Sequence, residues 1–105
     1  MRIRVLDESL DVLVVAMCQD YFRRKSIIEK GNVKRRIDTE LRYLNYKIYD
    51  AATEVVGEEN AELFIKEIGS RIGYAASECS MSESIYKTKK RDLKIKIAKN
   101  LYLTE

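Results

Sequence analysis

Residues 74–103, YAASECSMSESIYKTKKRDLKIKIAKNLYL, contain the clearest structural pattern in the chain. The pattern predicts a short helix, a tight break at Ser80-Met81-Ser82 and a longer helix. Ser82 is a favourable N-cap residue, because its hydroxyl can accept a backbone N–H from the first turn that follows. Apolar residues then recur at helical spacing: Tyr86, Leu93, Ile97 and Leu101. Such a stripe is expected to pack against the rest of the domain.

The longer helix is strongly basic outside its apolar stripe. One acid, Asp92, opposes its cationic residues, which are Lys87, Lys89, Lys90, Arg91, Lys94, Lys96 and Lys99. A basic amphipathic helix can present its charges to phosphates, to an anionic membrane or to water. Membrane-surface helices usually carry Trp or Phe, and this helix has neither. The composition therefore favours phosphate binding, with a solvated helix as the alternative and no membrane partner.

The segment before Ser80 has the residue types of the first helix of a helix-turn-helix. Ala75 and Ala76 are small enough for a second helix to cross closely, and Cys79 supplies an apolar residue near the turn. Ser80 stands where such turns often carry glycine. We therefore expect residues 74–103 to form a helix-turn-helix.

Three short motifs in this stretch carry a resemblance to a known family. Met81-Ser82-Glu83-Ser84-Ile85-Tyr86, followed by Lys89-Lys90-Arg91-Asp92-Leu93 and Ile97-Ala98-Lys99-Asn100-Leu101, resembles the C-terminal end of ArpU- and RinA-like phage transcriptional regulators. Their helix-turn-helix is similar to region 4 of sigma factors. The resemblance covers the last third of the chain. It departs from the family pattern at Lys87, where the family has a second Tyr, and the spacing from the cap to Leu93 is one residue shorter.

The resemblance implies a DNA-binding transcriptional regulator of phage or prophage type that acts on double-stranded DNA. It implies DNA-facing positions at Ser82, Ser84, Lys87, Lys90 and Arg91. The charge pattern adds Lys89 and Lys94 as phosphate contacts. A small module reads few base pairs, so a dimer is expected as well.

The whole chain of 105 residues is expected to form one helical domain, because it has no proline and only four glycines. Cys18 and Cys79 lie on helix patterns with apolar neighbours. Without a signal peptide, buried free thiols in a reducing cytoplasm are expected rather than a disulfide. No apolar run reaches membrane-spanning length. These features favour a cytoplasmic protein.

Catalysis has little support in the sequence. The chain has no histidine, which is the commonest general base and the commonest metal ligand. The glycines do not fit the spacing of a phosphate-binding loop. Glu58, Glu59 and Glu62 form an acidic group, but acids in a first helical turn are explained by the helix dipole. We expect no enzymatic activity, no cofactor and no metal.

Residues 7–56 predict a long helical hairpin. The first helix spans about residues 8–30, with Asp7 as its N-cap and Gly31 after its last turn. The second spans about residues 33–56, between a capping Asn32 and Gly57. Both glycines suit helix C-termini.

Residues 58–103 complete the predicted architecture with a third helix and the helix-turn-helix, and Gly73 either ends the third helix or marks a sharp bend. The expected fold class is therefore all-α, with four to five helices. Residues 1–6 alternate apolar and basic side chains, as in a short strand or an extended arm, and we favour the arm.

The second helix carries a short heptad seam. Its positions follow steps of four and three residues and are Ile37, Leu41, Leu44, Ile48, Ala51 and Val55. The seam either packs on the first helix or pairs in part with a second copy, which would form a homodimer through Ile37, Leu41, Leu44 and Ile48. Asn45, beside the seam, is expected to be exposed.

Two basic clusters flank the predicted turn at Gly31. They comprise Arg23, Arg24, Lys25, Lys34, Arg35 and Arg36. They are candidates for supplementary phosphate contacts, and solvated helix ends are an equally good interpretation. Tyr43, Tyr46 and Tyr49 recur at three-residue spacing on the second helix. Such tyrosines usually border a core, but they also support an alternative function, a small helical protein–protein interaction module that does not bind nucleic acid.

Overall fold

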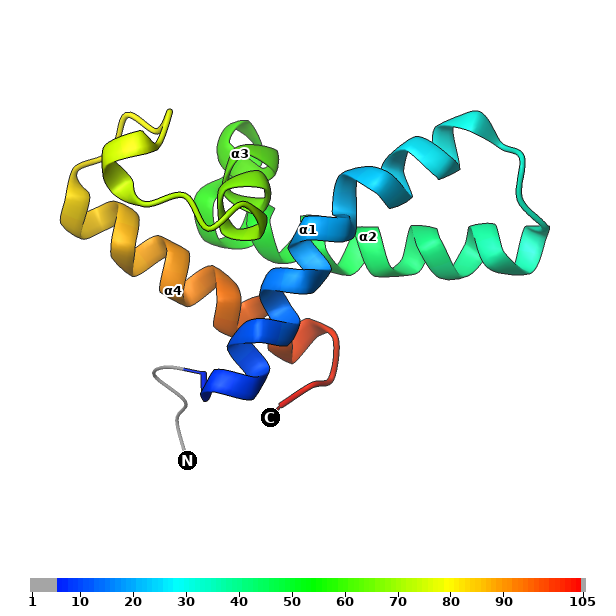
Figure 1. Cartoon of the computed structure of the whole chain (residues 1–105), viewed down its shortest axis with the longest axis horizontal. Coiled ribbons are helices and arrows are strands. Elements are labelled where there is room, and N and C mark those ends of the chain that lie inside the picture. The colour runs from blue at the N-terminus through cyan, green and yellow to red at the C-terminus, as the bar shows by residue number, and fades with distance from the viewer. Residues whose placement is uncertain (1–5, 105) are drawn as a thin grey trace.

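The structure is a computed structural model, and it describes residues 6–104. Within this range the chain forms α-helices and one turn of 3-10 helix (Figure 1). In chain order these are α1 (Glu8–Lys30), α2 (Arg35–Val56), α3 (Glu58–Gly69), η1 (Tyr74–Ala76) and α4 (Glu83–Asn100). The expected all-α class with four to five helices is confirmed. The arm predicted over residues 1–6 lies outside the described residues, apart from Leu6.

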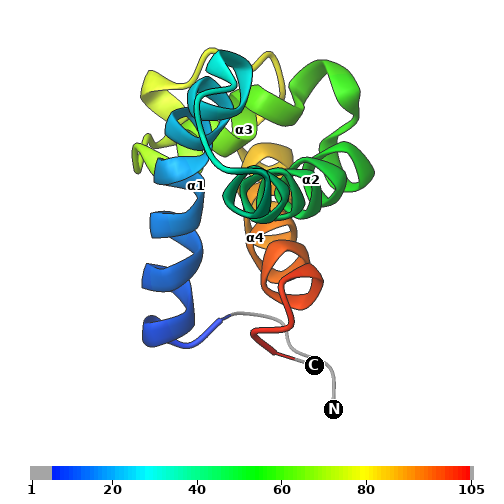
Figure 2. The same cartoon turned by 90° about the vertical axis from the view of Figure 1, so that its right-hand side faces the viewer.

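Helices α1 and α2 form the predicted antiparallel hairpin, whose distal end extends beyond α3 and α4 (Figure 1). Figure 2 looks almost along α2 and shows α1 to its left, α4 below it and α3 above it. Helix α2 contacts all three other helices. The core therefore lies around the C-terminal half of α2, and the distal half of the hairpin is a thinner two-helix projection.

The core consists mainly of aliphatic and aromatic side chains from all four helices. Its largest fully buried members are Phe64, Tyr86, Ile48, Ile65, Ile68, Leu93 and Ile97. Small residues bring the helices close together, because Ala51, Ala52 and Ala61 are fully buried. A Cβ at Gly69 would meet the backbone nitrogen of Gln19 at 2.8 Å, so the end of α3 touches the backbone of α1. None of the helices in residues 6–104 is long and apolar enough to cross a lipid bilayer.

Local capping chemistry determines both ends of α1 and the C-terminal end of α2. The Asp7 carboxylate accepts the Leu10 N–H at 2.9 Å, as predicted for an N-cap. Gly31 has φ 66°, in the left-handed region that glycine adopts without a Cβ clash, and Gly57 has φ 85°. Both glycines follow the helices that they were predicted to end.

Two predicted boundaries were wrong. Asn32 does not cap the second helix, because α2 begins at Arg35, and Lys34 occupies the N-cap position without a side-chain hydrogen bond. The third helix ends at Gly69 rather than at Gly73. It stops because the chain reverses at Arg71, with φ 54°, and the Ile72 N–H returns to the Glu67 carbonyl at 3.0 Å.

The short helix predicted before Ser80 was also wrong. Only residues 74–76 form a 3-10 turn, and the rest of residues 70–82 has no regular structure. Side-chain hydrogen bonds to Glu67 hold this segment in place of a helix, as described below. A tight helix-turn-helix is therefore not formed. The longer helix does begin after Ser82, although the Ser82 side chain makes no capping hydrogen bond.

Candidate functional site

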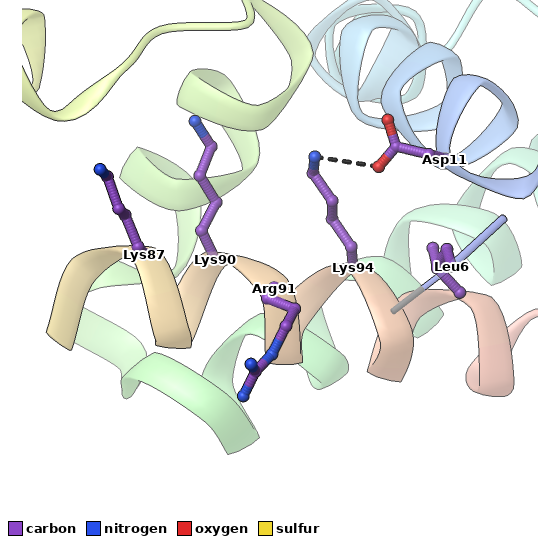
Figure 3. A pocket seen from close by; sticks show the side chains of 6 residues that line it. All are labelled: Leu6, Asp11, Lys87, Lys90, Arg91 and Lys94. Carbon is purple, nitrogen blue, oxygen red and sulfur yellow. Dashed lines mark ion pairs between the residues drawn. The ribbon is translucent and has the colours of Figure 1, made fainter. Parts of the chain in front are cut away.

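A groove lies between α4 and the N-terminal part of α1 (Figure 3). It has a volume of about 250 Å³, and its lining residues are Leu6, Asp11, Lys87, Lys90, Arg91 and Lys94. The four cationic residues all come from α4, where spacings of three and four residues place them near one side of the helix. We call this feature the basic groove. Because its lining holds four cations and one acid, the groove is a site of positive potential.

Lys94 and Lys90 each make polar contacts within the chain. Lys94 Nζ lies 3.0 Å from Asp11 Oδ1 and so joins α4 to α1. Lys90 Nζ donates a hydrogen bond to the Ile72 carbonyl and lies 5.4 Å from the centroid of the Tyr86 ring. Burial lowers the pKa of Lys90. These two lysines therefore supply charge to the groove but are not free to reach across a ligand.

Lys87 and Arg91 are the exposed cations of the groove. Lys87 Nζ lies 3.4 Å from Glu83 Oε2, and Arg91 Nη2 lies 3.4 Å from Asp92 Oδ1, with all four side chains about half exposed or more. Exposed ion pairs of this kind contribute little free energy, so both cations can exchange their partners for a phosphate. In Figure 3, Lys87, Lys90 and Lys94 extend to the same side of α4 and Arg91 extends away from them.

The first half of α4 also has an exposed outer surface. Ser84, Ile85, Thr88 and Lys89 line a shallow hollow of about 240 Å³. Ile85 is 51% exposed, which is unusual for a large apolar side chain. Ser82 and Ser84 are exposed at the start of the helix. In Figure 1 this end of α4 lies at the edge of the molecule, so the structure leaves it accessible.

Arg24 was wrongly predicted as a supplementary phosphate contact. It is 3% exposed, and each of its three guanidinium nitrogens donates a hydrogen bond within the chain. Its Nε donates to Asn45 Oδ1 at 2.7 Å, Nη1 to Asp20 Oδ2 at 2.9 Å and Nη2 to the Met17 carbonyl at 2.7 Å. Asn45, expected to be exposed, is buried, and its Nδ2 donates to the Tyr21 carbonyl at 3.0 Å. The pair joins α1 to α2.

The other basic residues near Gly31 do not extend the groove. Arg23 is paired with Asp20, and Lys25 Nζ lies 2.7 Å from Glu62 Oε2 on α3. Lys34, Arg35 and Arg36 are exposed at the start of α2. Figure 1 shows this end of the hairpin and the start of α4 at opposite ends of a molecule 43 Å long. Within residues 6–104, the basic groove and the distal end of the hairpin are therefore separate basic surfaces.

The predicted dimer residues differ in accessibility. Ile48 is fully buried in the core of its own chain, so it cannot contact a second copy. Leu41 and Leu44 are half-buried, and Ile37 is 45% exposed. The heptad seam therefore serves mainly intramolecular packing. Tyr43 and Tyr46, on another side of α2, are 47% and 61% exposed, whereas Tyr49 packs against the core.

Sequence reasoning missed a buried carboxylate at Glu67, which is 2% exposed. It accepts hydrogen bonds from Ser77 Oγ at 2.6 Å, from the Glu78 N–H at 3.0 Å and from the Tyr86 hydroxyl at 2.8 Å. Burial alone would raise the pKa of Glu67, but these hydrogen bonds and the nearby Lys90 charge outweigh it and lower the pKa. Burial and the Glu67 hydrogen bond raise the pKa of Tyr86 to about 12. The sequence did contain a signal for this burial, because Glu67 lies among Phe64, Ile65 and Ile68 on an apolar helix face.

Glu67 positions the basic groove indirectly. It fixes Ser77 and Glu78, and the same segment presents the Ile72 carbonyl to Lys90. The carboxylate is thus enclosed by donors and is not exposed to a ligand.

Neither cysteine nor any acidic cluster forms a second site. Cys18 and Cys79 are both free, and burial raises the pKa of Cys18 to about 12, which makes its thiol unreactive. In residues 6–104, no group of three or more Cys, Asp or Glu side chains converges to hold a metal ion. Comparison with protein-family models, with curated proteins and with solved structures finds no match. The geometry of the basic groove is therefore the basis for a functional assignment.

Proposed function

We propose that this protein binds double-stranded DNA through α4 and regulates transcription. The observation that carries the proposal is the clustering of Lys87, Lys90, Arg91 and Lys94 around one groove. Phosphate contacts by Lys and Arg supply most of the affinity of such proteins. Lys87 and Arg91 are the residues that bind phosphates directly, and Lys90 and Lys94 add positive potential behind them.

Base recognition is assigned to the outer surface of the first half of α4. A helix of this width fits the major groove of B-DNA. Ser84 and Thr88 offer hydroxyls that hydrogen-bond to base edges, and Ile85 offers an exposed side chain for a thymine methyl group. Ser82 and Lys89 lie beside this surface and serve as backbone contacts.

A role in transcription is proposed from the resemblance of the α4 region to ArpU- and RinA-like phage regulators. Of the resembling residues, Tyr86, Leu93 and Ile97 are buried, whereas Ser84, Ile85 and Arg91 are exposed on α4. Exposed residues of this kind are the ones that a recognition helix uses. The irregular segment before α4 is a departure from a sigma-like helix-turn-helix, so α4 would enter DNA without a tightly packed first helix. A cytoplasmic location accompanies this function.

The proposal predicts a change in the salt dependence of DNA binding. In the double variant Lys87→Ala/Arg91→Ala, the slope of log affinity against log salt concentration should fall by about 2, because two phosphate contacts are lost. Fluorescence anisotropy with a random duplex at several salt concentrations measures this slope. The matched control is Lys34→Ala/Arg35→Ala, which removes the same charge from exposed positions at the distal end of the hairpin and should leave the slope nearly unchanged. Equal losses in both variants would contradict the assignment of the groove.

A second candidate function, a helical protein-interaction module, is favoured by the exposed aromatic side chains of α2. Tyr43 and Tyr46 are about half exposed, and Tyr102 is 78% exposed. If the wild-type chain does not bind the duplex even at low salt, this function replaces DNA binding.

A further inference from the structure

The outer face of α2 carries a regular pattern of exposed charge. Arg36, Glu40, Tyr43, Lys47 and Asp50 follow steps of four, three, four and three residues, so they lie along one side of the helix. This side is distinct from the one that holds Ile48 in the core. Arg36, Glu40, Tyr43 and Asp50 are exposed and Lys47 is half-buried. The distal half of α2 extends past α3 and α4 (Figure 1). We call this side of the helix the α2 outer face.

The order of the charges is self-complementary about Tyr43. Arg36 lies seven residues before Tyr43 and Asp50 seven residues after it, while Glu40 lies three before and Lys47 four after. We propose that two copies of the chain pair through antiparallel α2 outer faces, with the two-fold axis beside Tyr43. Arg36 then faces the second copy's Asp50, and Glu40 faces its Lys47. Both contacts occur twice, as a symmetric dimer requires.

Alternative pairings of this face are disfavoured by the same charges. A parallel pair in register would place each charged residue opposite its own copy, so like charges would meet. The antiparallel arrangement leaves one residue of offset between Glu40 and Lys47, which is about 1.5 Å along the helix and within the reach of both side chains. Opposite charges across the two-fold axis therefore select both direction and register.

The apolar and aromatic side chains of the outer face suit a helix partner. Thr39, Glu40, Tyr43 and Leu44 line a hollow of about 440 Å³ on α2. Lys47 Nζ lies 5.4 Å from the centroid of the Tyr43 ring and 5.8 Å from that of Tyr102. This arrangement holds the lysine over the face. Aromatic side chains of this type dominate binding energy in protein interfaces.

The conformation and exposure of Tyr102 independently support a second copy on the α2 outer face. It has φ 59°, a left-handed conformation that costs a side chain of this size free energy and suits glycine better. Its ring is nevertheless 78% exposed, so it buries little within the single chain. A second copy seated on the α2 outer face would cover the ring at the edge of the interface.

The test compares the wild-type chain with charge-reversed variants in the absence of DNA. Sedimentation velocity at increasing protein concentration should show a dimer for the wild type. Glu40→Lys places two lysines opposite each other at both symmetric contacts, and Lys47→Glu places two glutamates there. Each single variant should dissociate roughly tenfold or more readily than the wild type, while keeping its helical circular dichroism signal.

Mixing the two single variants gives the sharpest result. In a mixed dimer the new lysine faces the new glutamate, and the native Lys47 faces the native Glu40, so both contacts are attractive again. The mixture should therefore form dimers that neither variant forms alone. A wild type that stays monomeric, single variants that dimerise like the wild type, or a mixture that stays monomeric would each overturn the proposal. Because no DNA is present, these outcomes do not depend on the proposed function.

Discussion

Arg24→Ala is expected to lower the free energy of unfolding by about 3 kcal/mol, because it removes one partner of a buried charged network. The guanidinium bonds Asn45, Asp20 and the Met17 carbonyl. Without it, the buried Asn45 carbonyl oxygen loses its donor, and α1 and α2 lose their main polar link. Urea denaturation followed by circular dichroism measures the change.

Arg23→Ala is the matched control for this variant. Arg23 contacts the same Asp20 carboxylate, but its side chain is 63% exposed. Exposed ion pairs contribute about 1 kcal/mol or less, so Arg23→Ala should change stability far less than Arg24→Ala. Similar effects of the two variants would show that Arg24 is not the polar link between the hairpin helices.

Glu67→Gln is expected to reduce the free energy of unfolding by about 2 kcal/mol at neutral pH, because hydrogen bonds to a charged carboxylate are replaced by weaker ones. One amide position would also present N–H to the Glu78 N–H or to the hydroxyls of Ser77 and Tyr86, all of which donate to Glu67. Glu59→Gln, an exposed change on the same helix, is the control and should have little effect.

The effect of Glu67→Gln should depend on pH in a defined direction. The folded-state pKa of Glu67 is lowered, so the unfolded chain binds more protons in this range. The stability from the carboxylate is fully present above the ordinary glutamate pKa of about 4.3 and is lost as pH falls through the lower folded-state value. The difference between wild type and variant in urea denaturation should therefore shrink on acidification. A difference that stays constant to about pH 3 would contradict the charged state assigned to Glu67.

Features that depend on neighbouring residues were predictable from the sequence. Asp7 caps α1 through a hydrogen bond three residues away, and Gly31 and Gly57 end α1 and α2 through their own backbone conformations. Helical spacing also predicted that Tyr86, Leu93 and Ile97 would be buried on one side of α4. Such interactions are complete within one or two turns, so a sequence pattern can indicate them, although Asn32 does not cap α2 and the Ser82 side chain makes no capping hydrogen bond.

Features that depend on distant partners were not predictable in the same way. Arg24 and Asn45 are polar residues of types that usually lie at the surface. They are buried because they hydrogen-bond to each other, although 21 positions separate them in the sequence. Residues 74–79 have helix-compatible side chains, yet Ser77 and Glu78 bind Glu67 from a preceding helix. The free energy of these long-range hydrogen bonds outweighs local helix propensity.

The basic groove has features that were predictable from the sequence and features that were not. The charge of α4 was evident from the sequence, but the sequence could not show which cations the fold would use. Lys90 lies on the same side of the helix as Tyr86 and Leu93 and so reaches the Ile72 carbonyl, and Lys94 meets Asp11 on α1. Lys87 and Arg91 remain exposed. The division between structural and available cations therefore required the three-dimensional arrangement.

DNA is expected to contact the first half of α4, and NMR tests this contact most directly. Amide resonances of the isotope-labelled wild-type chain are followed as a short duplex is added at low salt. The largest shifts should fall on residues 82–94, with small shifts at the distal end of the hairpin near Lys34 and Arg36. Shifts concentrated at that distal end, or no shifts at all, would contradict it.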